Sequence, residues 1–405
     1  MNIRPLQSLR ARPDLASRVA SVPYDVVDTR EARILAEGNP YSFLHVSRAE
    51  IGMPDSTDPY SEAVYARGHG NLIRFEQEKT LLRDTAAHLY LYRQTMGTHV
   101  QRGITACCST LDYDHHIIKT HEKTRQDKED DRTRHIKTLK AQTGPVFLVY
   151  RDKPEIDRLV ATIEQTHPLF DFVAADGIGH TGWTCPDSAT LMALFADVPA
   201  AYIADGHHRA AAASRVAKEC RAANRHHDGS EEYNWFLGVL FPASQVQVLP
   251  YNRLVKDLNG LTTAAFLEKV TPLFHISDAS TPSPSRPGTA CMYLQGKWYN
   301  LSWSVPTGAK PEDRLDVTVL QERLLGPILG ISDPRTSKRI EFSGGIRGTH
   351  ELEQRVQTGE ATVAFSMHPT TVQQMLDIAD AGGIMPPKST WFEPKLRDGL
   401  FVHTI

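Results

Sequence analysis

Residues 201–213 read AYIADGHHRAAAA, and this stretch decides how the chain is interpreted. Ala201, Tyr202 and Ile203 form a short apolar run that predicts a buried strand, with Asp205 and Gly206 directly after it. From Arg209 to about residue 225 the chain is rich in alanine, which favours a helix. A strand, a glycine and a helix in this order direct backbone N–H groups and the positive helix end toward one place.

The side chains of this turn suit a negatively charged ligand. Gly206 can adopt a positive φ and lets a ligand approach the backbone. His207, His208 and Arg209 offer donors in the first helical turn, and the Asp205 carboxylate can hold Mg²⁺ or orient a donor. The turn therefore predicts a phosphate site. The alternative is that Asp205 only caps the helix while both histidines face solvent.

The composition excludes several classes of protein. The 405 residues carry a net charge of -3, which argues against a broad nucleic-acid-binding surface. No window approaches the roughly 18 apolar residues of a membrane helix, and the N-terminus lacks the apolar run of a signal peptide. The five cysteines are scattered, without a Cys-x-x-Cys pair, as in a reducing compartment. We expect a cytoplasmic protein that binds neither nucleic acid nor membrane; a homodimer is left open.

Helical and strand patterns alternate along the chain and predict a mixed α/β (α+β) fold. Residues 42–46 and 235–241 read as strands, and residues 88–111 as a hairpin with a turn at residues 96–98. Helices are expected at residues 60–80, 154–165 and 371–381, and an exposed loop at residues 280–287. The expected regions are an N-terminal α/β region with a hairpin and a charged helix (1–150), a phosphate-binding region (151–260) and a C-terminal α/β domain (261–405).

Residues 120–142 form a strongly charged segment that also predicts a helix. In a helix, the basic and histidine side chains recur at spacings of 4, 3, 4 and 3 and share one stripe: His121, Arg125, Lys128, Arg132 and His135. Such a stripe can form one wall of a groove for an anionic ligand. It can equally be the solvated face of a helix laced by ion pairs.

Two further segments carry residues suited to chemistry. Lys388, Ser389 and Thr390 follow two prolines and offer one charge and two hydroxyls, which suit a phosphate or a small zwitterion. Their neighbours Trp391 and Phe392 can instead pack the tail into the core. Glu31 lies in the first turn of a short expected helix, where it interacts favourably with the helix dipole or acts as a catalytic base.

Several separated motifs resemble a family. Pro23-Tyr24-Asp25-Val26-Val27, Asn39 to Val46, His121-Glu122-x-Thr124, Asp205 to Arg209 and Met385 to Thr390 occur in the same order in the bacterial domain-of-unknown-function family numbered 1015. The resemblance covers nearly the whole chain.

The turn at Asp205 to Arg209 is also similar to that of the free serine kinases, which have a ParB/sulfiredoxin-like core and make O-phosphoserine from free L-serine with ADP or ATP. This resemblance implies such a core with a large insertion and an additional C-terminal α/β domain. It implies catalytic roles for Glu31 (as general base), Asp205 and His207, with Asp205 also a Mg²⁺ ligand. It implies a nucleotide-phosphate cradle of Gly206, His207, His208 and Arg209.

The same resemblance implies which residues bind the phosphoryl acceptor. The residues expected to bind a serine-like substrate are Tyr251, Arg253, Lys388, Ser389 and Thr390, and the insertion can supply His121 and Arg125 as further ligands. This chain departs from the kinases at Tyr251, where they have Trp, and at Trp391-Phe392, where they have Arg-His. The expected activity is transfer of a phosphoryl group between ATP or ADP and a small hydroxy amino acid. The alternatives are a ParB-like nucleotide-binding switch without turnover and another phosphotransferase or phosphatase reaction.

Overall fold

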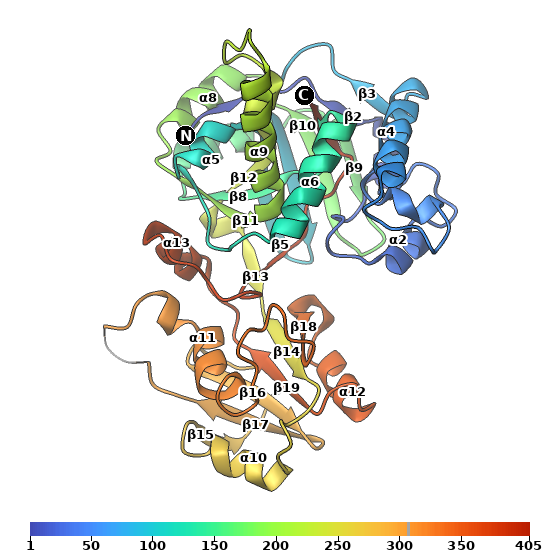
Figure 1. Ribbon diagram of the computed structural model, residues 1–405. Helices are drawn as coiled ribbons and strands as arrows, with labels where there is room; N and C mark the ends of the chain where they lie inside the picture. The colour runs from blue at the N-terminus through green and yellow to red at the C-terminus, as the bar shows by residue number, and fades with distance from the viewer. Residues whose placement is uncertain (306–307) are drawn as a thin grey trace. The chain divides into compact units, whose positions relative to one another are not determined.

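The computed structural model describes residues 1–305 and 308–405. The chain folds into two compact units. Unit 1 comprises Met1–Val246 together with Pro394–Ile405, and unit 2 comprises Gln247–Glu393 (Figure 1). Both units mix helices and strands, so the expected mixed α/β class is confirmed. Within the described residues, no helix is both long enough and apolar enough to cross a membrane.

Unit 1 is built on a nine-stranded sheet. Its strand order is β6 (Ile118–Lys119), β11 (Ala201–Asp205), β8 (Val146–Tyr150), β12 (Trp235–Pro242), β5 (His99–Ser109), β4 (Tyr90–Met96), β10 (Gly179–Thr184) and β9 (Phe170–Val173), and β1 (Ile3–Arg4) also pairs with β5. β11 runs parallel to β6, and β12 runs parallel to β8, while the remaining pairs are antiparallel. The hairpin expected at residues 88–111 is confirmed as β4 and β5.

The α-helices of unit 1 are α1 (Ala16–Val19), α2 (Thr29–Ala36), α3 (Leu44–Ser47), α4 (Glu62–Gln77), α5 (Thr110–Asp114), α6 (Gln126–Leu139), α7 (Pro154–Ile163), α8 (Ser188–Ala196) and α9 (His207–Ala223). The expected helices at 60–80, 154–165 and 209–225 are therefore confirmed as α4, α7 and α9. The helices α6 and α9 lie side by side over the large sheet (Figure 1).

Alanines bring α9 close to the sheet. Ala210, Ala212 and Ala213 are buried in one hydrophobic cluster with Ile203 of β11 and Leu148 of β8. Because these side chains end at Cβ, the helix backbone can approach the strands closely and its first turn is held firmly. The alanine-rich composition that predicts the helix thus also explains its packing.

The end of the chain returns to unit 1. β21 (Phe401–Thr404) pairs with β2 (Leu9–Ala11) and β7 (Ala141–Gln142), and β3 (Leu81–Arg83) completes this four-stranded sheet. Leu396, Leu400 and Val402 are buried. The last twelve residues therefore belong to the fold of unit 1 and place their side chains in it.

Unit 2 contains a six-stranded antiparallel sheet. Its order is β15 (His275–Asp278), β17 (Lys297–Ser302), β16 (Thr289–Leu294), β19 (Val363–Met367), β14 (Tyr251–Val255) and β18 (Ile340–Gly344). A separate pair joins β13 (Gln247–Leu249) to β20 (Trp391–Glu393). The α-helices are α10 (Thr263–Val270), α11 (Asp316–Leu320), α12 (His350–Gln357) and α13 (Val372–Asp380).

Some sequence expectations differ from the structure. The strand expected at residues 42–46 is wrong, because Leu44–Ser47 form the helical turn α3; a short apolar run does not distinguish a buried strand from a buried helical turn. The boundary expected at residue 150 separates β8 from β12, but these two strands pair in the same sheet. Residues on both sides of position 150 therefore belong to unit 1. Unit 1 ends at Val246, before the boundary expected at residue 260, and residues 394–405 lie in unit 1 rather than with 261–393.

Candidate phosphate site at the start of α9

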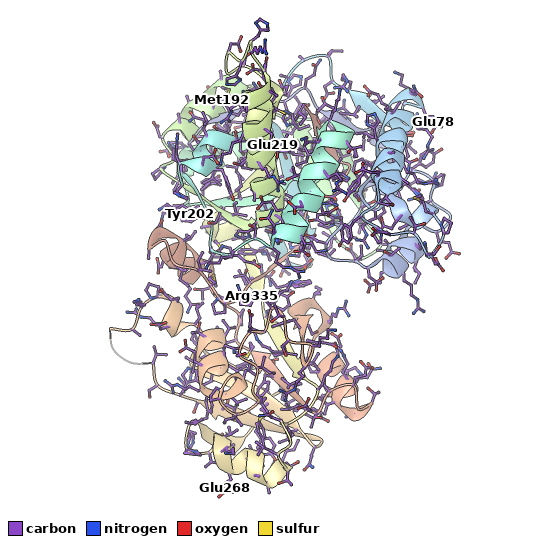
Figure 2. The ribbon with its side chains drawn as sticks, in the orientation of Figure 1. Glu78, Met192, Tyr202, Glu219, Glu268 and Arg335 are labelled. Carbon is purple, nitrogen blue, oxygen red and sulfur yellow. The ribbon has the colours of Figure 1, made fainter. Side chains whose placement is uncertain are left out.

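The turn between β11 and α9 has the geometry expected from the sequence. Figure 2 labels Tyr202 on the strand and Glu219 on the helix that meet there. The pairing of β11 shifts register between Ile203 and Asp205, which is a bulge at the end of the strand. Gly206 has φ 97° and ψ 29°, a left-handed conformation that glycine adopts without strain.

The first turn of α9 leaves backbone donors available. Its first helical hydrogen bond runs from the Ala210 N–H to the Gly206 carbonyl, at 3.0 Å. No side chain among the described residues caps this end of the helix. The N–H groups of His207, His208 and Arg209 precede that first bond, so they and the helix dipole are directed at one place where an anion is favoured.

A buried ion-pair cluster fixes the turn. The Arg209 guanidinium donates from Nη2 to Asp205 Oδ2 at 3.1 Å and from Nη1 to the Pro145 carbonyl. Lys395 Nζ lies 3.6 Å from the same Asp205 oxygen. Burial disfavours the charged guanidinium, but Asp25, Asp205 and Asp398 outweigh it and raise the pKa of Arg209. Asp205 is therefore held between two cations.

A small cavity lies beside this cluster. Its volume is about 30 Å³, room for roughly one water molecule, and its lining includes Tyr24, Arg132, Gly144, Arg209 and Asp398. The Arg132 guanidinium stacks 3.8 Å over the Tyr24 ring. Burial raises the pKa of Asp398 to about 7, against the opposing effect of Arg209. A carboxyl that titrates near neutrality thus lies among cations and a tyrosine.

The two histidines of the turn have different surroundings. His207 is buried and packs edge-on against the His121 ring, with ring centroids 4.5 Å apart. Burial lowers the pKa of both, that of His121 to about 4, so both rings are neutral at physiological pH. His208 is half-buried and accepts a hydrogen bond from the Arg125 N–H at 3.0 Å. The structure therefore places His121 and Arg125 beside the turn, and their role in binding a substrate stays a prediction.

The expected basic stripe on one helix is wrong in part. Arg125 is the N-terminal flanking residue of α6, with extended backbone, so neither it nor His121 lies on the helix. Lys128, Arg132 and His135 do lie on α6, and the last two are buried. Residues 121–135 therefore form neither a single solvent-exposed helix face nor a single basic stripe along one helix.

Glu31 has a clear structural role. Its carboxylate accepts a hydrogen bond from the Asp28 N–H at 2.9 Å, while Asp28 accepts one from the Glu31 N–H at 2.8 Å. This reciprocal capping box begins α2. The Glu31 side chain is exposed, and its function as a general base stays a prediction.

The remaining expected substrate residues lie in unit 2. Arg253 is buried on β14 and donates to the carbonyls of Tyr251 and Lys388. Burial lowers the pKa of Arg253 to about 10. Lys388 Nζ lies 5.6 Å from the centre of the Tyr251 ring, and Ser389 Oγ donates to the Pro386 carbonyl at 2.5 Å. The structure thus brings Tyr251, Arg253 and Lys388 together.

The sequence reasoning missed several residues that surround the turn. Asp398 and Lys395 come from the last twelve residues, and Pro145 precedes β8. Glu122 lies with its Oε2 4.0 Å from His207 Nδ1. The motif His121-Glu122-x-Thr124 was a usable signal for Glu122, because His121 was already a candidate. No motif around Asp398 offers a comparable signal.

We expect Gly206→Ala to destabilise unit 1, since a Cβ at this position would lie 2.9 Å from Arg209 Nε. The left-handed backbone alone costs a non-glycine residue about 1–3 kcal/mol. Gly229→Ala is the matched control, because Gly229 has φ 94° and a Cβ there meets nothing within 4 Å. Urea unfolding should show a larger loss of unfolding free energy for Gly206→Ala than for Gly229→Ala. Equal losses would mean that the Arg209 side chain moves aside without destabilising the fold.

A match to a protein-family model shows which family the chain belongs to. The model described as a protein of unknown function, DUF1015, matches residues 3–318. The chain belongs to the DUF1015 family. No curated protein sequence matches this DUF1015 chain.

Several solved structures are similar to the DUF1015 chain at low identity. A conserved hypothetical protein from Pyrococcus furiosus has 14% identity and a TM-score of 0.37, covering 74% of this chain and 95% of its own. A free serine kinase in complex with AMP has 12% identity and a TM-score of 0.37, covering 73% and 92%. SbnI with a C-terminal truncation, from Staphylococcus aureus, has 10% identity and a TM-score of 0.40, covering 73% and 85%.

Proposed function

We propose that this protein is a phosphotransferase that holds nucleotide phosphates at the start of α9 and exchanges a phosphoryl group with a small hydroxy amino acid, with L-serine as the first candidate. One observation carries the proposal: α9, which no side chain caps within the described part of the chain, begins at a left-handed glycine next to a buried arginine and an aspartate. The similarity of Asp205 to Arg209 to the turn of free serine kinases supports the same ligand.

The turn provides what phosphoryl transfer needs from a protein. Such transfer depends on alignment and on neutralising charge at the transferred group. The N–H groups of the first turn of α9 would bind phosphate oxygens in place. Arg209 is fixed by Asp205 and Pro145, so its charge contributes to the potential there without reorganisation.

Mg²⁺ fits this arrangement through Asp205. Mg²⁺ takes one or two carboxylates and fills its other positions with phosphate oxygens and water. The Asp205 side chain is 28% exposed at the start of the helix, so one carboxylate is accessible where the phosphates would lie. The bound ion would supply further neutralisation of phosphate charge. ATP and ADP are both candidates as the donor.

The residues that bind the phosphoryl acceptor are proposed from their resemblance, position by position, to residues of the free serine kinases. Glu31 would take the proton of the acceptor hydroxyl. Tyr251, Arg253, Lys388, Ser389 and Thr390 would bind the amino acid, and His121 and Arg125 would contribute from beside the turn. Arg253 and Lys388 each carry a positive charge that suits the amino-acid carboxylate.

Phosphorus NMR tests the proposed reaction. The full-length protein would be incubated with Mg²⁺, with ATP or ADP, and with a panel of serine, threonine and homoserine. We expect a phosphomonoester signal with one member of the panel and a matching loss of the donor. Nucleotide binding without any new ester would overturn the kinase proposal and favour a nucleotide-binding switch.

Glu31→Gln isolates the proposed general base. Glutamine still accepts the hydrogen bond from the Asp28 N–H, so the capping box and the fold should persist. Loss of the base should lower kcat by roughly 10²- to 10⁴-fold. The measurement is kcat on the acceptor identified by NMR, alongside the melting temperature. Full activity in a normally folded variant would show that Glu31 only caps α2.

A further inference from the structure

Three potential metal ligands converge beside the turn. His121 and Glu122 follow β6, and His207 is the first residue of α9. One ligand atom from each lies within 4.8 Å of the other two. His207 Nδ1 is 4.0 Å from Glu122 Oε2, and the two imidazole rings lie edge to face. Two separate segments of unit 1 thus place two histidines and a carboxylate around one point.

Both imidazole rings carry a nitrogen that no described residue contacts by a hydrogen bond. His121 is 2% exposed and His207 is 5% exposed. His121 Nδ1 and His207 Nε2 are buried without a hydrogen-bond partner among the described residues. A buried polar atom left without a partner loses its hydration and gains nothing in return, which is unfavourable. Two such nitrogens in a cluster of potential metal ligands indicate that the cluster binds a further group.

We infer that His121, Glu122 and His207 bind a divalent transition-metal ion. Two imidazoles with one carboxylate suit Zn²⁺ and its first-row neighbours, whereas Mg²⁺ prefers oxygen ligands. Ligand atoms on one zinc ion lie about 3.3 Å apart, so these side chains, whose ligand atoms lie within 4.8 Å of one another, must draw together when the ion binds. The Glu122 side chain is 39% exposed and has room to move toward the two histidines.

The surroundings of the cluster support this assignment. His121 is hydrogen-bonded to the backbone of Ile203, and its Nδ1 has no partner, so the bond uses Nε2. Metal-bound histidines commonly hold their second nitrogen to a carbonyl in this way, which fixes the orientation of the ring. Asp205 contributes negative charge nearby, and Arg209 opposes it. Three protein ligands leave at least one position for water or a phosphate oxygen.

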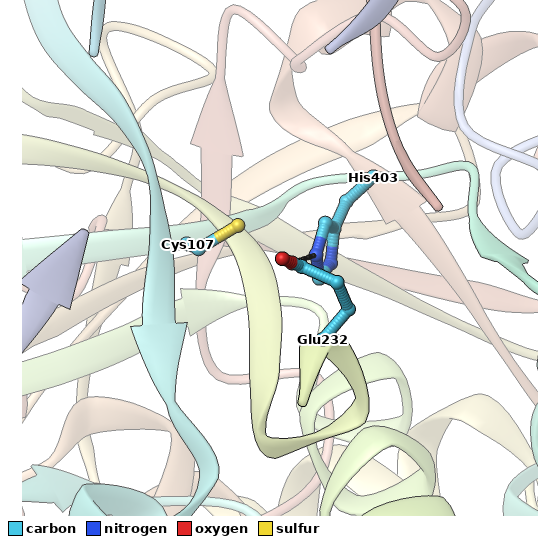
Figure 3. A group of neighbouring side chains, drawn as sticks. All are labelled: Cys107, Glu232 and His403. Atoms are coloured by element: carbon cyan, nitrogen blue, oxygen red, sulfur yellow. Dashed lines mark hydrogen bonds and ion pairs between the residues drawn. The ribbon is translucent and has the colours of Figure 1, made fainter. Parts of the chain in front are cut away.

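A second cluster of similar composition lacks these features. Figure 3 shows Cys107, Glu232 and His403, whose ligand atoms also lie within 4.8 Å of one another. Here His403 Nε2 is 2.7 Å from Glu232 Oε2 and Nδ1 is 3.4 Å from Gln142 Oε1, so both ring nitrogens have partners. Glu232 is also paired with Arg4. Both imidazole nitrogens of His403 therefore have hydrogen-bond partners, whereas His121 and His207 each have one nitrogen without a partner among the described residues.

Metal titration of the full-length protein tests the inference without nucleotide, so its result is independent of the proposed phosphoryl transfer. The protein would be stripped with a chelator and titrated with Zn²⁺ by calorimetry and with Co²⁺ by visible absorption. We expect one ion per chain and a Co²⁺ spectrum without the intense near-ultraviolet band of thiolate ligation.

Variants locate the ion. His121→Ala should abolish stoichiometric binding, and Glu122→Gln should weaken it at least tenfold while leaving the fold intact, because Glu122 is partly exposed. His226→Ala is the matched control, since His226 is an exposed histidine on the loop after α9 and should change nothing. The inference fails if the wild type binds no ion at micromolar concentrations, if both ligand variants bind as the wild type does, or if binding disappears with Cys107→Ala.

Discussion

Arg209→Met should destabilise the protein by about 3–5 kcal/mol, the cost of leaving buried charges without their partner. The Pro145 carbonyl loses its donor, and the Asp398 carboxyl loses the cation that most lowers its pKa. Asp205 keeps Lys395, which limits the loss. Urea unfolding at neutral pH measures the change. Arg215→Met on the same helix is the control, because exposed ion pairs such as those of Arg215 contribute less than about 1 kcal/mol.

The pH dependence of this loss identifies its cause. Asp398 has a folded pKa of about 7, so between about pH 4 and pH 7 the folded protein keeps a proton that the unfolded chain releases. Its contribution to stability is therefore greatest at low pH and falls as the pH rises through that window. Removing Arg209 raises this pKa further, so the penalty should be smaller at pH 5 than at pH 8. An equal penalty at both values would place the effect in packing rather than charge.

The turn itself was predictable because its determinants are local. A short apolar strand, a glycine that tolerates positive φ and an alanine-rich helix follow one another within the stretch from Ala201 to Ala213. Each step is a backbone preference that needs no distant contact. The hairpin of β4 and β5 was predictable for the same reason, since Gly97 at φ 59° makes the tight turn between adjacent strands.

The surroundings of the turn were not predictable, because they depend on distant pairing. Lys395 reaches Asp205 only because β21 pairs with β2 and β7 and so draws the end of the chain into unit 1. No local pattern in the sequence specifies that pairing, because the paired strands lie far apart along the chain. The cation that fixes Asp205 and the carboxyl that titrates near neutrality thus lie nearly 200 positions from the turn that they serve.

The charged segment shows how a helical pattern misleads near a helix end. The spacing from His121 to His135 fits one helical face, but α6 begins at Gln126 and Arg125 has an extended backbone. The extended stretch frees the Arg125 N–H for His208 and lets the His121 ring meet His207. The departure from the helical pattern is therefore what brings these two residues to the turn.

His403 should give the protein a distinct loss of stability in mild alkali. Burial disfavours its charged form, but the Cys107 sulfur and the Glu232 carboxylate outweigh burial and raise the pKa of His403 to about 9 (Figure 3). Because the folded pKa is higher than that of the unfolded chain, the contribution is fully present below about pH 6.5. It amounts to roughly 3 kcal/mol and is lost progressively as the pH rises to about 9.

The contribution is measured as the difference in unfolding free energy between the wild type and His403→Gln from pH 5.5 to pH 9.5. The difference should stay constant up to about pH 6.5, shrink between about pH 6.5 and pH 9, and then level off, since the uncharged glutamine does not titrate. Glu232→Gln, at a half-exposed position, should narrow the pH range over which stability is lost without abolishing the loss, because Cys107 still stabilises the imidazolium. His226→Gln should leave the profile unchanged. A constant difference at all pH values would mean that His403 is neutral when folded and that the group of Figure 3 is held by packing and neutral hydrogen bonds.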